Sequence, residues 1–201
     1  CNYKDSIQRI SDYLEDKGIS HANFYGGLEQ QDRERALIKF RNGTHQLLLA
    51  TDLAARGIDI PEIKFIIHYH LPHSKEEFIH RNGRTARMHA SGTAYLLKGM
   101  DEIFPDYIDQ EHYQKIKEKA VPSPSPWTTL FISGGRKDKI SKGDIAGTFI
   151  KQGNIQNDEL GVIELKQDCA FVSVAKNKAD HIIQTLNNTR IKKKKVRIRE
   201  I

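Results

Sequence analysis

The chain has 201 residues, of which 38% are hydrophobic and 29% are charged, so it is long enough for two domains that each bury a core. Its apolar runs are all far shorter than the ~20 residues that cross a bilayer, so we expect neither a spanning helix nor a membrane partner. Two cysteines, Cys1 and Cys169, are too few for a disulfide framework and lack metal-ligand spacing. We therefore expect a cytoplasmic protein without a metal site. Because the sequence starts at Cys1 rather than Met, we also expect a fragment.

The positive charge is concentrated in the last third of the sequence. Residues 1–126 carry 17 Lys+Arg and 18 Asp+Glu, whereas residues 127–201 carry 15 and 8. A small basic domain beside a neutral one indicates a polyanionic partner, most commonly nucleic acid. The alternative is a merely solvated, lysine-rich surface.

Residues 1–119 alternate helical and strand patterns. Apolar residues at helical spacing predict helices, short apolar runs between turn residues predict buried strands, and Ser74-x-x-Glu77 is a capping box. Strands that alternate with helices predict an α/β domain with a parallel sheet. The expected helices cover residues 5–17, 30–41 and 74 to about 87, with a short one within 101–119, and the expected strands cover 47–50, 65–67 and 92–97.

Residues 120–126 (Ala-Val-Pro-Ser-Pro-Ser-Pro) are predicted to form a linker, because prolines remove backbone donors and favour extended backbone. After it, residues 127–201 predict a second, small α+β domain. Its expected element order is βαββαβ, which is typical of an RRM-like RNA-binding fold. The expected strands are 128–132, 161–165, 170–174 and 196–201, and the helices are 141–152 and 176–186.

Two segments of the first domain carry residues suited to nucleotide chemistry. Residues 50–61 (ATDLAARGIDIP) follow a predicted buried strand, where open α/β sheets bind ligands, and Asp59 could accept a hydrogen bond from a ribose hydroxyl. In residues 80–87 (HRNGRTAR), Arg84 and Arg87 are three apart, so on a helical turn both guanidinium groups would face one phosphate. An isolated Arg-x-x-Arg is more often a surface cluster paired to acids.

Together these segments resemble motifs V and VI of the DEAD-box branch of superfamily 2 helicases. YGGLEQQDRERALIKFRNG resembles the segment IVa of that family, and Cys1-Asn2 is similar to the end of its motif IV. The resemblance implies a second RecA-like domain, truncated at its N-terminus. It departs from the family at Ala86 (usually Gly), at Asn82 (usually Ile) and at Tyr25-Gly26-Gly27 (usually His-Gly-Asp).

Carried over position by position, the resemblance implies specific roles for residues of the first domain. Arg84 and Arg87 would be arginine fingers on the γ-phosphate of ATP, with Asp59 on its ribose. His80 and Arg81 would contact a preceding domain that holds most of the ATP and its Mg²⁺. Gln30, Arg33 and Thr51 would contact the RNA backbone. The sequence has neither a phosphate-binding loop nor Asp-Glu-Ala-Asp, so we expect this fragment alone to be inactive.

The second domain resembles the RNA-binding domain of the DbpA and YxiN helicases, on PWTTLFISGGRKDKISKGDIAGTFI and LGVIEL. That resemblance implies a structured hairpin of large-subunit ribosomal RNA as target, on ribosome assembly intermediates. From the residues themselves, Phe131 and Phe171 are candidates to stack on bases, or else core residues, and Cys169 stands where a further aromatic is usual. Phosphate contacts are expected from two basic segments. They comprise Arg136, Lys137 and Lys139, and Lys192, Lys193, Lys194 and Lys195.

We therefore expect the C-terminal half of a monomeric, ATP-dependent RNA helicase. One alternative is a non-catalytic RNA-binding adaptor that keeps a helicase-like scaffold. Another is a DNA helicase of the same superfamily. The RecQ type of that group has Gln-Glu where this chain has His80-Arg81, and an RRM-like domain would be unexpected there.

Overall fold

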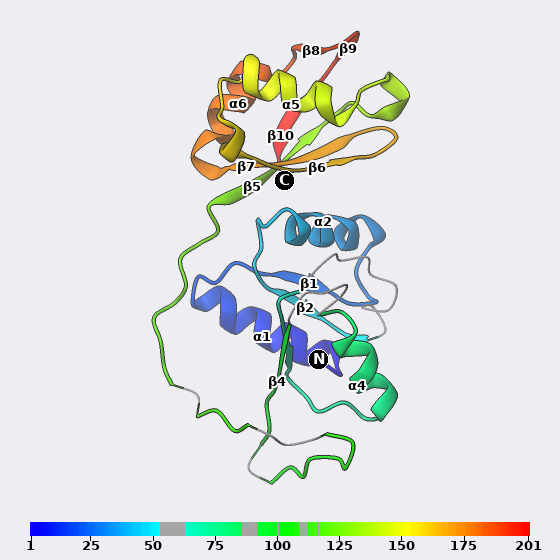
Figure 1. The fold of residues 1–201 in the computed structure, drawn as a ribbon, viewed down its shortest axis with the longest axis vertical. Helices are drawn as coiled ribbons and strands as arrows, with labels where there is room; N and C mark the ends of the chain where they lie inside the picture. The colour runs from blue at the N-terminus through cyan, green and yellow to red at the C-terminus, as the bar shows by residue number, and fades with distance from the viewer. Residues whose placement is uncertain (53–62, 86–91, 100, 109–111, 116) are drawn as a thin grey trace. The chain divides into compact units, whose positions relative to one another are not determined.

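A computed structural model describes residues 1–201 except 53–62, 86–91, 100, 109–111 and 116 (Figure 1). The described chain divides into two compact units, each made of three separate stretches of the sequence. Unit 1 comprises Cys1–Ile19, Asn23–Leu28 and Leu49–Ser123, and unit 2 comprises Ser20–Ala22, Glu29–Leu48 and Pro124–Ile201. The domain boundaries at residues 119 and 127 stay a prediction.

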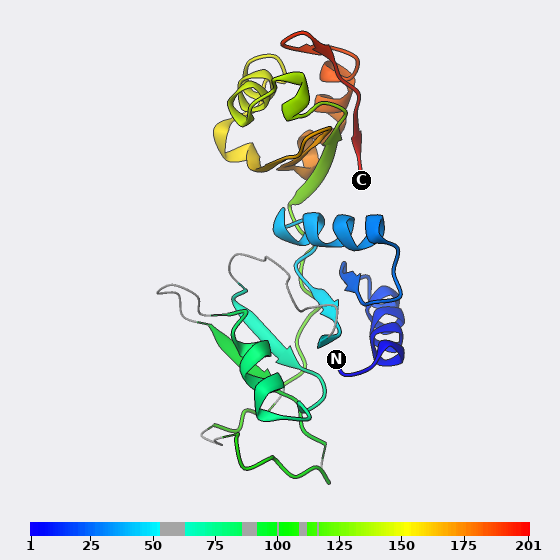
Figure 2. The same cartoon turned by 90° about the vertical axis from the view of Figure 1, so that its right-hand side faces the viewer.

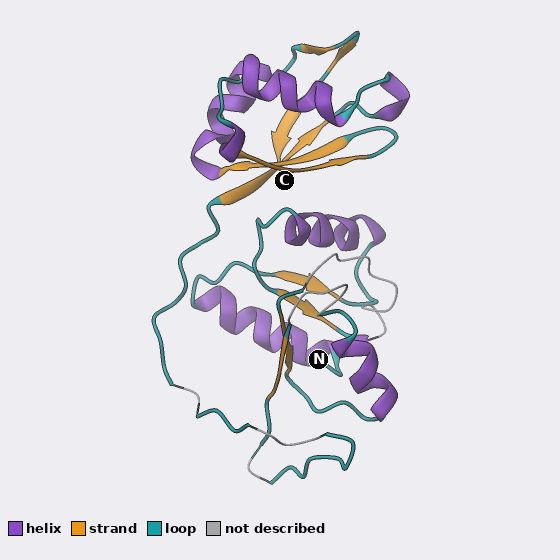
Figure 3. Ribbon diagram, in the orientation of Figure 1, coloured by secondary structure: helices purple, strands orange, loops and turns teal. Residues whose placement is uncertain are grey.

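The elements before the linker follow the expected order of helices and strands, except that β1 (Ala22–Phe24) was not expected from the sequence (Figure 3). Strands β3 and β4 pair in parallel, Phe65 opposite Thr93 and His68 opposite Leu96, as a crossover connection requires (Figure 2). Strands β1 and β2 form a second two-stranded sheet. The elements are α1 (Lys4–Asp16), β1 (Ala22–Phe24), α2 (Gln30–Arg41), β2 (Leu48–Ala50), β3 (Phe65–His68), α4 (Lys75–Asn82) and β4 (Thr93–Leu96).

Two expectations about this region are wrong. Helix α4 ends at Asn82 instead of continuing to about residue 87, because Gly83 closes it and Thr85 then pairs with Ile63. The described part of 101–119 contains turns and irregular backbone and no helix. The start of α4 is as expected, since the hydroxyl of Ser74 accepts a hydrogen bond from the Glu77 N–H at 3.3 Å.

The region after the linker has the expected βαββαβ order, with one addition. Its four-stranded antiparallel sheet has the order β10-β5-β7-β6. A small hairpin, β8–β9, precedes the last strand and was not expected from the sequence. The elements are β5 (Trp127–Ile132), α5 (Lys142–Lys151), β6 (Leu160–Leu165), β7 (Ala170–Ala175), α6 (Ala179–Leu186), β8 (Arg190–Ile191), β9 (Lys194–Lys195) and β10 (Ile198–Glu200), with 3-10 turns at Arg136–Asp138, Asn157–Glu159 and Lys176–Lys178.

One apolar core holds this region together. Alternate residues of β5 and β7, including Leu130 and Val172, face helices α5 and α6, which contribute Phe149 and Ile182. All four side chains have 0% exposed surface. Figure 1 shows both helices on the same face of the sheet. The side chains that alternate with these point to the opposite face of the sheet.

Candidate functional site

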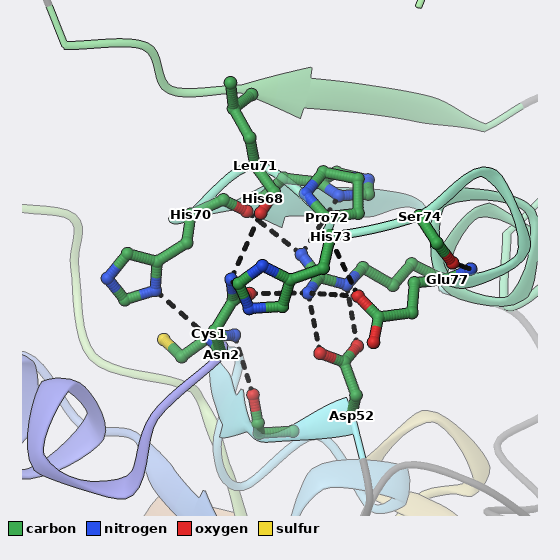
Figure 4. Close-up of polar contacts among 12 residues, drawn as sticks. Cys1, Asn2, Asp52, His68, His70, Leu71, Pro72, His73, Ser74 and Glu77 are labelled. Atoms are coloured by element: carbon green, nitrogen blue, oxygen red, sulfur yellow. Dashed lines mark hydrogen bonds and ion pairs between the residues drawn. The ribbon is translucent and has the colours of Figure 1, made fainter. Parts of the chain in front are cut away.

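A largely buried ion pair joins Asp52 and Arg81, one from each of the two nucleotide-related segments of unit 1. Arg81, near the end of α4, donates from Nε to Asp52 Oδ1 and from Nη2 to Asp52 Oδ2, both at 2.6 Å. The side chains are 10% and 24% exposed. Such a two-point contact fixes the direction as well as the distance between the partners. Asp52 lies directly after β2, so the pair links the end of that strand to α4 (Figure 4).

The remaining donors of Arg81 bind two further segments. Nη1 donates to the carbonyl oxygen of His70 at 3.0 Å, and Nη2 donates to Asn2 Oδ1 at 2.6 Å. Glu77 Oε2 lies 4.0 Å from Nη2. Arg81 therefore connects α4 with three other parts of the unit: the start of the chain, the end of β2 and the loop after β3. Its expected contact with a preceding domain stays a prediction, while neighbouring His80 is exposed.

Asn2 anchors the start of the chain to the loop that follows β3. Its backbone N–H donates to His70 Nδ1 at 3.2 Å, and its side-chain amide donates to the Leu71 carbonyl at 3.1 Å. The same amide lies 2.9 Å from His73 Nε2. Burial lowers the pKa of His70, which favours the neutral ring that accepts this hydrogen bond. Figure 4 shows these contacts as dashed lines between Asn2, at the start of the chain, and the loop at His70–His73.

A second buried pair lies beside Arg81. His68, at the end of β3, is 1% exposed, and its Nε2 lies 2.9 Å from Asn82 Oδ1. Its Nδ1 lies 3.5 Å from Arg81 Nη1. Because Asn82 Oδ1 only accepts, the proton belongs on Nε2 and leaves Nδ1 to face the arginine as an acceptor. Burial lowers the pKa of His68, in agreement with a neutral ring. Asn82, where the family usually has Ile, therefore has a defined partner here.

The predicted finger Arg84 lies in a turn rather than on a helix. Its backbone N–H donates to the carbonyl of Arg81 at 3.2 Å, and the hydroxyl of the next residue, Thr85, donates to the carbonyl of Ile63. This bridge brings residues 84–85 next to Ile63. The expectation that Arg84 and Arg87 share a helical turn is thus wrong for Arg84. Arg87 and Asp59 lie outside the described residues.

The residues expected to contact RNA from the first domain lie on two elements. Gln30 and Arg33 share the first turn of α2, where Arg33 Nη2 donates to Gln30 Oε1 at 2.6 Å. Arg33 Nε is buried and has no partner within the described residues. Thr51 follows β2, and its N–H donates to the Phe24 carbonyl at 3.2 Å. Gln30 and Arg33 belong to unit 2 and Thr51 to unit 1. Their RNA contacts stay predictions.

The two basic segments of the C-terminal region form one surface. The β8–β9 hairpin reaches the loop before α5, where Lys192 Nζ donates to the Lys139 carbonyl at 2.7 Å. Lys192 also pairs with Asp144 at 2.8 Å, and Lys194 pairs with Asp138 at 3.2 Å. We call this group the basic surface. Its basic members are Arg136, Lys137, Lys139, Lys192, Lys193, Lys194 and Lys195.

Acidic residues balance only part of this charge. The hydrogen bond from Lys192 is the main reason that the pKa of Asp144 falls to about 2. Lys137 forms an ion pair with Asp168. Lys193 and Lys195 are exposed on the hairpin. The basic surface has seven basic side chains, and three carboxylates pair with them, those of Asp138, Asp144 and Asp168. The surface therefore keeps positive charge that would attract a polyanion such as an RNA backbone.

Phe131 and Phe171 lie on the sheet face that turns away from α5 and α6. They are cross-strand partners, with ring centroids 5.7 Å apart at 62°. The guanidinium of Arg199 lies 5.1 Å from the Phe131 ring centroid. The two rings are therefore separate from the helix-covered core. Phe171 is nevertheless only 9% exposed.

Among the described residues there is neither a cluster of metal-binding side chains nor a helix that could span a membrane. Among them, no three His, Cys, Asp or Glu side chains gather in a way that could bind a metal ion. Their helices are all too short or too polar to cross a bilayer.

Sequence reasoning missed His68 and His70 in this site, because each acts through a partner far away in the sequence and local patterns gave no signal. Asn2 was noted only as part of a segment similar to the end of motif IV. For Asp52, the signal was an acidic side chain that can accept hydrogen bonds where a predicted strand ends.

Comparison with known proteins identifies both regions. Residues 1–89 match the helicase conserved C-terminal domain, and residues 129–200 match the DbpA RNA binding domain. The ATP-dependent RNA helicase DbpA of Bacillus subtilis is 30% identical over 98% of this chain and 48% of its own length. The ATP-dependent RNA helicase DbpA of Escherichia coli is 32% identical over 99% of this chain and 45% of its own length. The chain thus spans about half the length of these relatives.

Among solved structures, the yeast DEAD-box splicing factor Prp28 matches 51% of this chain and 23% of its own, with 30% identity and a TM-score of 0.48.

Proposed function

Because the chain belongs to the DbpA-type DEAD-box helicases and corresponds to their C-terminal half, we propose that the full-length protein is an ATP-dependent RNA helicase. In this proposal, residues 1–119 complete the ATP site of a preceding domain. Residues 127–201 bind the RNA target. The Arg81–Asp52 pair is the observation that carries the proposal, since it ties Asp52 of segment 50–61 to Arg81 of segment 80–87.

In this proposal, residues of this chain bind only part of the ATP, and the preceding domain binds the Mg²⁺. Arg84 lies in the turn before the Thr85–Ile63 bridge, whereas Arg87 and Asp59 lie outside the described residues. In our proposal, Asp59 binds the ribose and the two arginines bind the phosphates of the same nucleotide. Arg84 and Arg87 would stabilise negative charge that develops on the γ-phosphate. Mg²⁺ would supply further charge neutralisation from the preceding domain.

The basic surface supports RNA as the partner of the C-terminal region. We propose a structured hairpin of large-subunit ribosomal RNA as its target, and ribosome assembly in the cytoplasm as its setting, with the protein acting as a monomer. The proposal follows the family resemblance of residues 129–200 and the charge of the β8–β9 hairpin.

Measuring ATP hydrolysis by the full-length protein, with and without RNA, tests this function. Arg84→Ala and Arg87→Ala should each lower the RNA-stimulated rate by roughly 10²-fold or more, because a finger acts mainly on the transition state. RNA affinity should change little. The matched control is Lys75→Ala, an exposed residue at the start of α4.

Absence of hydrolysis in the unmodified full-length protein, with RNA binding intact, would favour the non-catalytic adaptor instead. Turnover at the normal rate in both arginine variants would contradict the finger assignment.

A further inference from the structure

The sheet of the C-terminal region is buried on both faces. Leu130 and Val172 lie under α5 and α6, as described above. On the opposite face, Thr129 is 0% and Ser173 is 1% exposed. An antiparallel sheet with helices on one side leaves its other face to water or to a partner. Small polar side chains at such a face become this inaccessible only when another part of the protein covers them.

The covering segment is the end of α2 with the turn that follows it, in the same compact unit. The hydroxyl of Ser173 donates to the carbonyl of Asn42 at 2.7 Å. The hydroxyls of Thr44 and Thr129 lie 2.7 Å apart. Asn42 itself is 3% exposed. These contacts satisfy polar groups that would otherwise be buried without partners.

Charge complementarity reinforces this contact. Arg41, the last residue of α2, donates from Nε and Nη2 to the two carboxylate oxygens of Glu164, at 2.7 and 2.8 Å. The two side chains are only 19% and 16% exposed. A second pair joins Glu34 and Lys166 at 3.0 Å. A two-point, largely buried pair sets orientation as well as proximity.

The geometry points to an intramolecular docking surface: we propose that the outer face of the β10-β5-β7-β6 sheet binds residues 41–44 of the same chain. Phe131, Phe171 and Glu164 are successive cross-strand partners, so they lie in one row on this face. Domains of this fold commonly stack RNA bases there. In this protein Glu164 of this row is paired with Arg41, and in our proposal RNA binding falls to the basic surface.

Disulfide trapping in the 201-residue chain tests the docking directly. Thr44→Cys and Thr129→Cys are introduced together, with Cys1 and Cys169 replaced by Ser. Because the two hydroxyls are in contact, the new thiols should form a disulfide readily under mild oxidation. The control pair is Thr44→Cys with Gln184→Cys, since exposed Gln184 lies on α6, behind the opposite face of the sheet. Equal trapping of both pairs, or none of the first, would overturn the proposal.

A charge exchange gives a second, independent test. Arg41→Glu in the trapping background should slow disulfide formation about tenfold, because it places two carboxylates face to face. Adding Glu164→Arg should restore the rate, since the pair is then present in reverse. Circular dichroism of each variant shows whether the fold is retained. An unchanged rate in folded Arg41→Glu, or no recovery in the double exchange, would count against docking.

Adding RNA to the trapping reaction distinguishes intramolecular docking from RNA binding at this sheet face. Structured and unstructured RNAs should leave the trapping rate unchanged. If RNA blocks disulfide formation, the face is an RNA-binding surface and the docking proposal fails.

Discussion

The two units of the chain are stabilised by different kinds of contact. In unit 1, the residues that position the candidate site form a buried polar network around Arg81, Asp52 and His68. In unit 2, the C-terminal sheet and its helices enclose an apolar core that includes Leu130 and Phe149. The stability of a polar network depends on pH and on whether every buried polar group has a partner. The stability of an apolar core depends on how well the buried side chains fill its volume. Mutations should therefore have different consequences in the two units.

The largest effect is expected from Arg81→Met, which leaves Asp52 without its partner. Removal of one member of a buried ion pair costs about 3–5 kcal/mol in the free energy of unfolding. Circular dichroism during urea unfolding should detect this loss. Trp127 is the only tryptophan of the sequence and belongs to unit 2, so its fluorescence should change little.

The matched control is Arg35→Met, because Arg35 pairs with Asp32 at 3.7 Å on an exposed helix surface. Surface pairs of this kind contribute up to about 1 kcal/mol. A similar loss in both variants would mean that the Arg81 network does not stabilise unit 1 in the way described.

A somewhat smaller effect is expected from Leu130→Ala in the apolar core. The cavity and the lost burial together cost about 3 kcal/mol. Here Trp127 fluorescence should report the loss, and it should be the same at pH 6 and pH 8. Val162→Ala, at a side chain that is 48% exposed, should change stability by less than about 1 kcal/mol. If the stability loss in Leu130→Ala depended strongly on pH, the proposed difference between the two units would be wrong.

An intermediate effect is expected at the His68–Asn82 pair. Asn82→Ile should destabilise unit 1 by about 2 kcal/mol, since it leaves a buried imidazole N–H without an acceptor. Replacing both residues, as His68→Leu with Asn82→Ile, should recover most of that loss. Urea unfolding of the two single variants and the double variant measures the coupling. Additive losses would show that the residues do not act as a pair.

The smallest effect concerns pH. Burial lowers the pKa of His68 from 6.5, so the unfolded chain binds a proton more readily than the folded one. Stability of unit 1 should therefore be highest above pH 6.5 and should fall as the pH drops below that value. Thermal unfolding monitored by circular dichroism between pH 5 and pH 8 tests this. The His68→Leu, Asn82→Ile double variant should show a weaker dependence, and an equal or steeper one would exclude His68 as its source.

Local patterns were sufficient to predict much of the fold. The helix over residues 30–41 agrees with α2, and the helix predicted from residue 141 agrees with α5, where Ser141 and Asp144 form a capping box with reciprocal hydrogen bonds of 3.2 and 2.8 Å. Alternation and turn residues likewise predicted the strands of the C-terminal sheet. These features depend on residues that are close together in the sequence.

Long-range contacts account for what the sequence did not predict. Helix α4 ends early because Thr85 pairs with Ile63, 22 residues away. The site includes Asn2 because its side chain meets Arg81, 79 residues away. The two-residue strands of the β8–β9 hairpin are too short for a hydrophobic pattern. Contacts of this kind depend on the assembled tertiary structure.

The most direct test of the proposed function is whether the basic surface makes ATP hydrolysis selective for a structured ribosomal RNA. In the full-length protein, Lys193→Ala with Lys195→Ala should raise the concentration of that RNA needed for half-maximal stimulation about tenfold, because two phosphate contacts are lost. The maximal rate should stay the same. The control, Lys115→Ala with Lys117→Ala, removes equal charge outside the basic surface. Unchanged RNA dependence in the first variant, or an equal change in the control, would contradict the account.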